Sequence, residues 1–439
     1  METGLTHQHM WTDIQGWIAR SSRILIKKLA RNDYAWADGS QHGHQNGVYI
    51  PREIREAGFF PPLRNTNPAK PHIFDARFET LWPGTGETKL STLKHYSNKG
   101  TEMHFTRVPR DEFSELTPAS WLLGGILKTP VGQTHYWFMV IDSGCEEAEL
   151  LESMFVLDSN FHFALFDPAR LPSAPGDEAQ QLIEELSHAL RNGTLDQFIE
   201  RASRMPTSDD FALLAQDAWL EENHHDRIDP WVIPNPGDAI MRISRDIEYA
   251  IFKRVELRFR AAQVLRTVAD GADLVSAVVR GFPALNEAFL GASQSRRSRA
   301  GRSFEHHVAR VFRDGSIRHE EQAVVGDRRP DFVLPDVVTL KSKTRRFDEA
   351  VIVSLKTKLR ERWKQLSLER FNSDIFLATV DDRVTAAAIS NMADNGIHLL
   401  VPESLKKSKE TCYADMANVI TFRDFFDEEI ARKRPHLHF

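Results

Sequence analysis

The chain has 439 residues, of which 41% are hydrophobic and 27% charged, a composition typical of soluble globular proteins and long enough for two or three domains of roughly 100–200 residues each. No apolar run approaches the roughly 20 residues that cross a bilayer, and the first residues do not resemble a secretory signal. With only Cys145 and Cys412, the chain has neither a disulfide framework nor a four-cysteine zinc site. These features exclude a membrane-spanning or disulfide-rich secreted protein and predict a cytoplasmic location.

The net charge of −6 is unevenly distributed along the chain. Between Asp177 and Asp229, 13 acidic residues accompany 4 basic ones, whereas between Lys341 and Arg370 there are 10 basic and 4 acidic residues. Phosphate binding responds to the local potential rather than to the sum over the chain, so the basic segment is a candidate contact for nucleic acid. Solvated helix faces produce the same pattern, and charge alone leaves both interpretations open.

The first 170 or so residues are predicted to be rich in β-strands. His72–Trp82 alternates apolar and polar residues, which predicts a half-buried strand with Phe74, Ala76 and Phe78 on the inner face. Further strands are predicted from the β-branched and aromatic runs at Arg23–Leu29, Ser120–Lys128 and Tyr136–Asp142. Short strands separated by turn residues at this spacing are typical of a barrel or a sandwich.

In the middle of the chain the sequence pattern changes from strands to a linker and helices. Leu171–Gly176 has the composition of a linker, and the acidic stretch after it has helical spacing, so we interpret it as helical connecting material that ends where Ile228–Gly237 opens the next domain. From Ile243 the pattern is again helical. An apolar residue recurs every four positions in this helix, at Ile247, Ile251, Val255 and Phe259.

After Asp331 the pattern becomes α/β. Buried strands are predicted at Ala350–Leu355, Ile375–Val380 and Ile397–Val401. A charged helix over Thr357–Phe371 and a second helix over Val384–Asp394, ending before Gly396, separate these strands. This alternation implies parallel pairing through right-handed crossovers.

Four residues of the C-terminal half could form a hydrolytic centre. Asp331 leads into the apolar strand Phe332–Leu334, and Lys356 ends the next strand. Glu369 can lie on the face of its helix that is directed toward these strand ends, and Glu305 shares an apolar helical stripe. Metal-assisted phosphodiester hydrolysis needs hard oxygen ligands and a cation near the scissile phosphate, which these residue types supply. Each residue alone also fits a structural or solvated role.

Six stretches of the chain, in order, resemble the EcoRII restriction endonuclease family: Asn32–Pro51, Arg245–Phe252, Ser295–His307 (SRRSRAGRSFEHH), Arg329–Pro335 (RPDFVLP), Ser354–Gln365 (SLKTKLRERWKQ) and Gly396–Lys407. These stretches span nearly the whole chain, and the Lys-Thr…Arg-Trp-Lys-Gln block is specific. The resemblance implies a nuclease core of the PD-(D/E)xK type.

In that core, Asp331, Lys356 and Glu369 would be catalytic, with Glu305 as an additional acidic member, and Asp331 and Glu369 would hold Mg²⁺ directly or through water. The residue two positions before Lys356 is Ser354 rather than a carboxylate. In this branch of the superfamily the second carboxylate is similarly displaced to the helix, at the position of Glu369.

Arg360, Glu361 and Arg362 look like the DNA-reading segment of enzymes that recognise CC/GG-type sequences. Arginine can pair with both O6 and N7 of guanine, and glutamate accepts a hydrogen bond from cytosine N4. The resemblance therefore implies a five-base-pair target of the CCWGG type.

The N-terminal part resembles the effector domain of the family, a β pseudobarrel whose two arms grip the major groove. The first arm would lie near Arg31–Gln45 and the second near Lys99–Arg110. The candidate DNA contacts are Arg31, Asn32, His44 and Gln45 in the first arm and Glu102, His104 and Arg107 in the second. A histidine metal site at His42, His44 and His104 is disfavoured, because no cysteines or HExxH pattern accompany them.

We therefore predict a multidomain fold. Residues 1–172 form the β pseudobarrel effector domain, 173–228 an acidic helical linker, and 229–439 an α/β restriction-endonuclease-like catalytic domain. The predicted activity is that of a type II (type IIE) restriction endonuclease, a homodimer that breaks both strands of double-stranded DNA with Mg²⁺. By the family resemblance, a second target copy at the N-terminal domain would activate cleavage.

Two alternatives stay open from the residues alone. In one, the chain is a DNA-binding regulator without catalysis, and its acidic residues are structural. In the other, it is a repair nuclease that nicks mismatched or branched DNA. The histidine motifs of HNH and phospholipase-type nucleases are not present in the sequence.

Overall fold

The computed structural model describes most of the chain: residues 11–37, 47–65, 67–100, 103–129, 134–155, 157, 161–170, 176–269, 279–282, 302–324, 329–359 and 372–438. The chain divides into two compact units. Unit 1 comprises Met1–Pro172 together with Asp382–Thr385 and Ser408–Cys412, and unit 2 comprises the remainder. The assignment of residues 173–228 as a linker stays a prediction. No helix in the described part of the chain combines the length and apolarity needed to span a bilayer.

One mixed sheet organises unit 1. Its strands are β1 (Ser21–Lys28), β2 (Val48–Tyr49), β3 (Ile73–Trp82), β4 (Glu87–Tyr96), β5 (Met103–Thr106), β6 (Trp121–Leu127), β7 (Tyr136–Ile141) and β8 (Phe163–Phe166). They are ordered β2-β5-β4-β3-β7-β6-β1-β8. The β3–β7 pair is parallel and the other neighbours are antiparallel. The strands expected near residues 23–29, 72–82, 120–128 and 136–142 are present. Whether this sheet is the pseudobarrel of the family stays a prediction.

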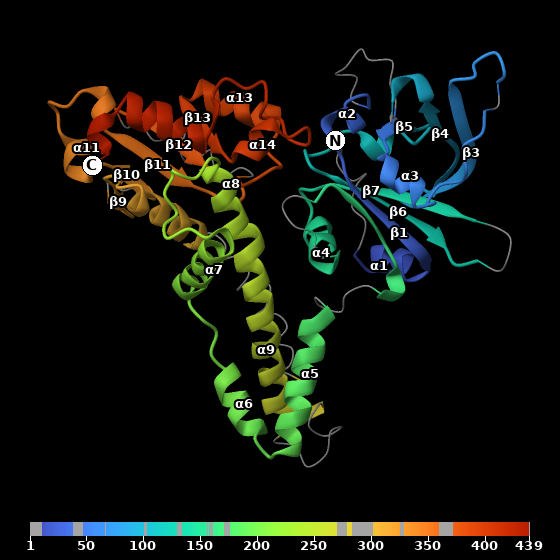
Figure 1. Ribbon diagram of the computed structural model, residues 1–439, viewed down its shortest axis with the longest axis horizontal. Helices are drawn as coiled ribbons and strands as arrows, with labels where there is room; N and C mark the ends of the chain where they lie inside the picture. The colour runs from blue at the N-terminus through green and yellow to red at the C-terminus, as the bar shows by residue number, and fades with distance from the viewer. Residues whose placement is uncertain are drawn as a thin grey trace. The chain divides into compact units, whose positions relative to one another are not determined.

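Helices cover both faces of this sheet (Figure 1). They are α1 (Trp11–Ala19), α2 (Arg31–Tyr34), α3 (Arg52–Glu56) and α4 (Glu146–Phe155), with short 3-10 turns at Ser97–Lys99, Asp111–Phe113 and Pro168–Arg170. The apolar side chains of α1 and α4 pack on one face, and those of α2 and α3 on the other. Because both faces are covered, Ile24–Lys28 of β1 is buried at every position instead of alternating.

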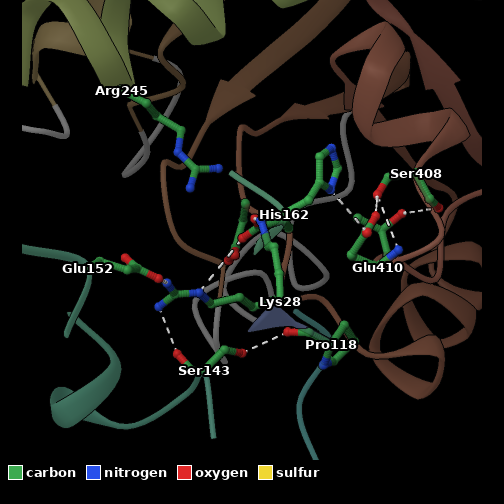
Figure 2. A network of polar contacts seen from close by, with 12 residues as sticks. Lys28, Pro118, Ser143, Glu152, His162, Arg245, Ser408 and Glu410 are labelled. Atoms are coloured by element: carbon green, nitrogen blue, oxygen red, sulfur yellow. Dashed lines mark hydrogen bonds and ion pairs between the residues drawn. The ribbon is translucent and has the colours of Figure 1, made fainter. Parts of the chain in front are cut away.

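Polar contacts hold the two short C-terminal segments of unit 1 (Figure 2). Asp382 forms a buried ion pair with Lys28 of β1 at 2.6 Å. Arg383 pairs with Glu152 of α4 and donates to the Ser143 carbonyl at 2.7 Å. In Ser408–Cys412, Glu410 lies 3.3 Å from His162, which precedes β8. The sequence contains no periodic signal for these long-range pairs.

Unit 2 contains a six-stranded sheet with the order β14-β13-β12-β11-β10-β9. Its strands are β9 (Glu320–Glu321), β10 (Phe332–Leu334), β11 (Val351–Leu355), β12 (Asp374–Ala378), β13 (Ile397–Val401) and β14 (Val419–Thr421). The pairs β11–β12 and β12–β13 are parallel, as predicted, and β13–β14 is parallel as well. By contrast, β9–β10 and β10–β11 are antiparallel.

The helical part of unit 2 includes α5 (Gly176–Arg191), α6 (Leu195–Ala202), α7 (Ser208–Asn223), α8 (Pro236–Met241), a π-helical turn at Arg242–Ile247, α9 (Glu248–Ala269), and a helix over residues 302–314. Around the sheet lie α11 (Val337–Lys341), α13 (Ala386–Asp394), α14 (Glu403–Lys407), α15 (Phe422–Asp424) and a π-helical turn at Phe425–Arg432. Short 3-10 turns occur at Phe347–Glu349 and Pro435–Leu437.

Helices α5 and α6 lie beside α9 and share a small apolar core with it (Figure 1). Leu182, Phe198 and Ala262 are buried there. Helix α7 begins with a capping box, since Thr207 accepts from the Asp210 amide while Asp210 accepts from the Thr207 amide. The acidic stretch therefore forms helices with buried apolar faces.

Two helices differ in detail from the sequence pattern. In α9, which is helical as predicted, the buried row is Glu248, Phe252 and Glu256, one position away from the apolar row, whose members Ile251 and Val255 are only half-buried. Two glutamates thus lie on the inner face. Thr357–Leu359, the expected start of the charged helix, is not helical, and the rest of that helix lies outside the described residues.

Candidate active site

Asp331 lies immediately before β10 and is almost buried, with 8% of its surface exposed. Its Oδ2 accepts a hydrogen bond from the Leu355 amide at 2.6 Å. That bond follows from the antiparallel pairing of β10 with β11, in which Phe332 faces Val353, so the carboxylate lies beside the end of the next strand. The sheet register therefore fixes this carboxylate in place.

Lys356 follows the last residue of β11. Its amide donates to the Ala378 carbonyl at 3.0 Å, which extends the parallel ladder with β12 and orients the residue. The ammonium Nζ lies 3.6 Å from Asp331 Oδ2 and donates to the Leu355 carbonyl at 2.8 Å. The predicted aspartate and lysine therefore lie side by side at neighbouring strand ends, where β10 begins and β11 ends.

Glu305 reaches the same place from the helix over residues 302–314. It is half-buried, because the neighbouring Phe304, Val308 and Ala309 are buried in the core. Burial raises the pKa of the Glu305 carboxyl, the negative charge of Asp331 raises it further, and Lys356 opposes the rise. The structure thus brings Glu305, Asp331 and Lys356 together.

A buried polar cluster holds this helix in place. His307 Nε2 lies 2.8 Å from Glu248 Oε2 of α9, and its Nδ1 lies 3.1 Å from the Gln216 amide of α7. Ser303 also donates to Glu248. Because Ser303 and His307 flank Glu305 in sequence, the cluster fixes the direction in which Glu305 points.

Gln322 is a site residue that the sequence reasoning missed. Its Nε2 donates to Glu305 Oε2 at 2.6 Å and lies 3.4 Å from Asp331 Oδ1. The residue follows β9, which pairs with β10, so only the antiparallel β9–β10 pairing brings it to the site. No local pattern in the sequence marks it.

The two carboxylates fit a divalent cation. Carboxylate oxygens are the ligands that hard cations prefer. Glu305 and Asp331 both contact one group, the side-chain NH₂ of Gln322, whose hydrogens carry partial positive charge. Within the described residues no cluster of three or more His, Cys, Asp or Glu side chains could hold a metal. Glu369, the remaining predicted ligand, lies outside the described residues, as do Arg360, Glu361 and Arg362.

The bases of the two predicted arms in unit 1 are joined. Strand β2, which follows the first arm, pairs with β5 of the second, placing Tyr49 opposite His104. Arg110 Nε donates to the Ala37 carbonyl at 2.6 Å and ties the ends of the two segments together. The described ends of the two segments in which the arms are expected therefore lie next to each other.

Asp33 anchors the base of the first arm. It is buried and accepts hydrogen bonds from Lys27 at 2.5 Å, from the Tyr49 amide at 2.7 Å and from the Ala30 amide at 2.9 Å. These bonds tie α2 to β1 and β2.

The candidate contacts of the arms are only partly described. Arg31 and Asn32 are exposed on α2, His104 is half-buried, and Arg107 is exposed with a left-handed φ of 59°. The other candidates, His44, Gln45 and Glu102, lie outside the described residues, as does His42. Their role in DNA binding stays a prediction.

Comparison with known proteins agrees with the class of enzyme expected. Residues 268–426 match the family model described as EcoRII C terminal. The chain is 25% identical to the type II restriction enzyme EcoRII of Escherichia coli over 91% of its own length and 92% of that enzyme. It is 30% identical to the type II restriction enzyme SsoII of Shigella sonnei over 33% of its own length and 50% of that enzyme.

Among solved structures, metal-depleted Ecl18kI in complex with uncleaved DNA aligns with a TM-score of 0.44 and 22% identity, covering 55% of this chain and 85% of that one. From the sequence matches, the chain is a type II restriction endonuclease, a site-specific endonuclease. Within that class it is similar to EcoRII over most of its length, and residues 268–426 match the EcoRII C-terminal family model.

Proposed function

We propose that the chain cleaves both strands of DNA at a CCWGG-like site in a Mg²⁺-dependent reaction. The observation that supports the proposal is the convergence of Glu305, Asp331 and Lys356. Asp331 Oδ2 lies 3.6 Å from Lys356 Nζ, and the side-chain amide of Gln322 contacts both Asp331 and Glu305. The reaction class comes from the relatives, both type II restriction enzymes.

Asp331 and Glu305 would hold Mg²⁺, with Glu369 as the further ligand expected from the family resemblance. When bound, the cation polarises the scissile phosphate and the attacking water. Lys356 would orient that water and stabilise the charge that develops on the phosphate, because its ammonium is fixed at the edge of the sheet.

Sequence recognition would come from Arg360, Glu361 and Arg362, which follow β11 and carry the donors and acceptor that G·C pairs require. In the proposed organisation, residues 1–172 bind a further copy of the target and stimulate cleavage. Residues 173–228 connect this domain to residues 229–439, which cleave the DNA. Two copies of the chain would act on the two strands of one duplex, which matches the two-fold symmetry of such a site.

Incubating supercoiled plasmid with the protein, with Mg²⁺ or with EDTA, tests the activity directly. We expect discrete fragments only with Mg²⁺, and sequencing their ends gives the target and the cut position. Stimulation by a short duplex carrying that target tests the effector site. Nicked plasmid without discrete fragments would contradict the proposal.

Lys356→Ala tests the mechanism. Loss of the ammonium should lower the cleavage rate by roughly 100- to 1,000-fold, as removal of a transition-state donor does in other enzymes. Binding of target DNA in the absence of Mg²⁺ should persist. The matched control is Lys407→Ala, which removes the same charge from an exposed position at the end of α14 and should cut normally. Cleavage by Lys356→Ala at the rate of the parent would remove Lys356 from the mechanism.

A further inference from the structure

The amide of Gln322 occupies the point on which the two candidate metal ligands converge. Its Nε2 lies 2.6 Å from Glu305 Oε2 and 3.4 Å from Asp331 Oδ1. An ionised carboxylate accepts hydrogen bonds and donates none, so the NH₂ end of the amide must face both groups. A cation bound by the same oxygens would meet this NH₂ group and its partial positive charge.

The main chain of Gln322 is held firmly, whereas its side chain has only these two partners among the interactions described. Its amide donates to the Asp331 carbonyl at 2.9 Å, and its carbonyl accepts from Arg329 Nε at 3.0 Å. The residue has a left-handed φ of 52°, a strained conformation for a non-glycine residue that persists only where the surroundings impose it. The side chain is therefore the part that can move when a cation enters.

We propose that Gln322 is a positioning residue that takes the place of the metal ion: its amide bridges Glu305 and Asp331 before the cation binds and withdraws when it does. This inference rests on the metal site of the proposed function and deepens it. Without the amide, the two carboxylates would repel each other and lose their common direction. The same amide competes with the cation, so it preserves the geometry of the site at the expense of affinity.

The competition predicts an unusual direction of change. A residue that only supports the fold loosens metal binding when it is removed. Gln322→Ala should instead tighten it, because no hydrogen bond to the carboxylates has to be broken. We expect the dissociation constant for Ca²⁺ to fall by about tenfold, the size of one charge-assisted hydrogen bond.

The experiment uses the full chain, without DNA, and Ca²⁺ alone as the probe, titrated by calorimetry. Gln322→Met keeps the volume of the side chain but removes its hydrogen-bond donor, so it should tighten Ca²⁺ binding as Gln322→Ala does. It therefore tests the inference even if the smaller alanine perturbs folding. Gln322→Glu adds a third carboxylate and should bind Ca²⁺ most tightly. Its thermal midpoint without metal should be lowered, and Ca²⁺ should restore it.

The matched control is Gln180→Ala in α5. Gln180 also donates its amide to a glutamate, Glu184, at 2.9 Å, but at an exposed position of its helix. This variant should bind Ca²⁺ as the parent does. Glu305→Gln and Asp331→Asn should weaken binding and so assign the measured affinity to this site.

Two results would overturn the inference: one would refute only the role of Gln322, and the other would refute the metal site as well. An unchanged or weaker Ca²⁺ affinity in both Gln322→Ala and Gln322→Met, with binding still dependent on Glu305, would leave the metal site intact and refute the role of Gln322. Parental affinity in Glu305→Gln and Asp331→Asn would refute the metal site itself, and the inference with it.

Discussion

Buried carboxylates in unit 1 are stabilised in two different ways. Asp33 is paired with Lys27 and accepts two backbone amides, so its charge is compensated. Glu112, which is 2% exposed, accepts from the Val140 amide at 3.2 Å. Burial raises the pKa of Glu112 to about 7, and nearby carboxylates add to the rise. The two residues should therefore respond differently to pH.

The raised pKa of Glu112 makes unit 1 less stable at alkaline pH. In the unfolded chain this carboxyl ionises near its ordinary pKa of 4.5, whereas in the folded protein it does so near 7. The folded state thus binds more protons between these values, and the free energy of unfolding falls as pH rises through this window. The shift corresponds to a loss of about 3 kcal/mol above pH 7.

Glu112→Gln should remove this loss. We expect the variant to be more stable than the parent by up to about 3 kcal/mol at pH 8.5, with a much smaller difference at pH 5, because a neutral amide has no charge to desolvate. Urea unfolding at the two pH values, followed by tryptophan fluorescence, measures it. Glu79→Gln, at an exposed position of β3, is the control. A gain in stability that is the same at both pH values would contradict the assigned pKa.

At the scale of elements, α9 shows how a buried polar pair changes the face that a helix presents. Its inner row contains Glu248, Phe252 and Glu256, although the sequence pattern assigns carboxylates to solvent. Glu248 tolerates burial because His307 and Ser303 from another helix satisfy it. The helix is therefore turned by one residue from the orientation that its apolar spacing predicts.

Two neighbouring substitutions test this orientation. Phe252 is 1% exposed and packs edge-on against Phe211, with ring centroids 5.6 Å apart. Phe252→Ala should cost about 3–5 kcal/mol of stability, as for other buried phenylalanines. Ile251→Ala, from the half-buried row, should cost only about 1 kcal/mol. Chemical denaturation of both variants measures the difference, and a larger loss for Ile251→Ala would contradict the orientation of α9 described above.

At the scale of the whole molecule, each unit has its own sheet and its own buried side chains. Every described member of the candidate active site belongs to unit 2: Glu305 lies on a helix, and Gln322, Asp331 and Lys356 lie next to the ends of strands in the six-stranded sheet. Unit 1 also includes the segments Asp382–Thr385 and Ser408–Cys412, which lie far along the chain. The nuclease chemistry should therefore be separable from most of unit 1.

Deleting residues up to about 175 should leave a folded, freely active nuclease, since Glu305, Gln322, Asp331 and Lys356 all belong to unit 2. Circular dichroism and plasmid cleavage of the fragment test this, and Lys356→Ala in the same fragment is the inactive control. Cleavage should no longer respond to an added target duplex. An insoluble or inert fragment would count against two separable modules.

The local elements could be predicted because backbone geometry imposes short periods on the sequence. Alternation over residues 72–82 predicted β3, and the continuous apolar run over residues 350–355 predicted β11. The resemblance to EcoRII-type enzymes pointed to Glu305, Asp331 and Lys356, which the structure brings together. Strands β4, β5 and β8 were missed: β4 and β8 show no clear alternation of buried and exposed residues, and β5 has only four residues.

What the sequence by itself determined is the longer, strongly patterned strands and helices and the chemical groups available for hydrolysis. The tertiary structure decided which of those groups meet. Gln322 joins the site only because β9 pairs with β10, and Glu248 is buried only because His307 lies opposite it. Periodicity reports the environment along one element, whereas such contacts depend on how distant elements pack, which no local pattern encodes.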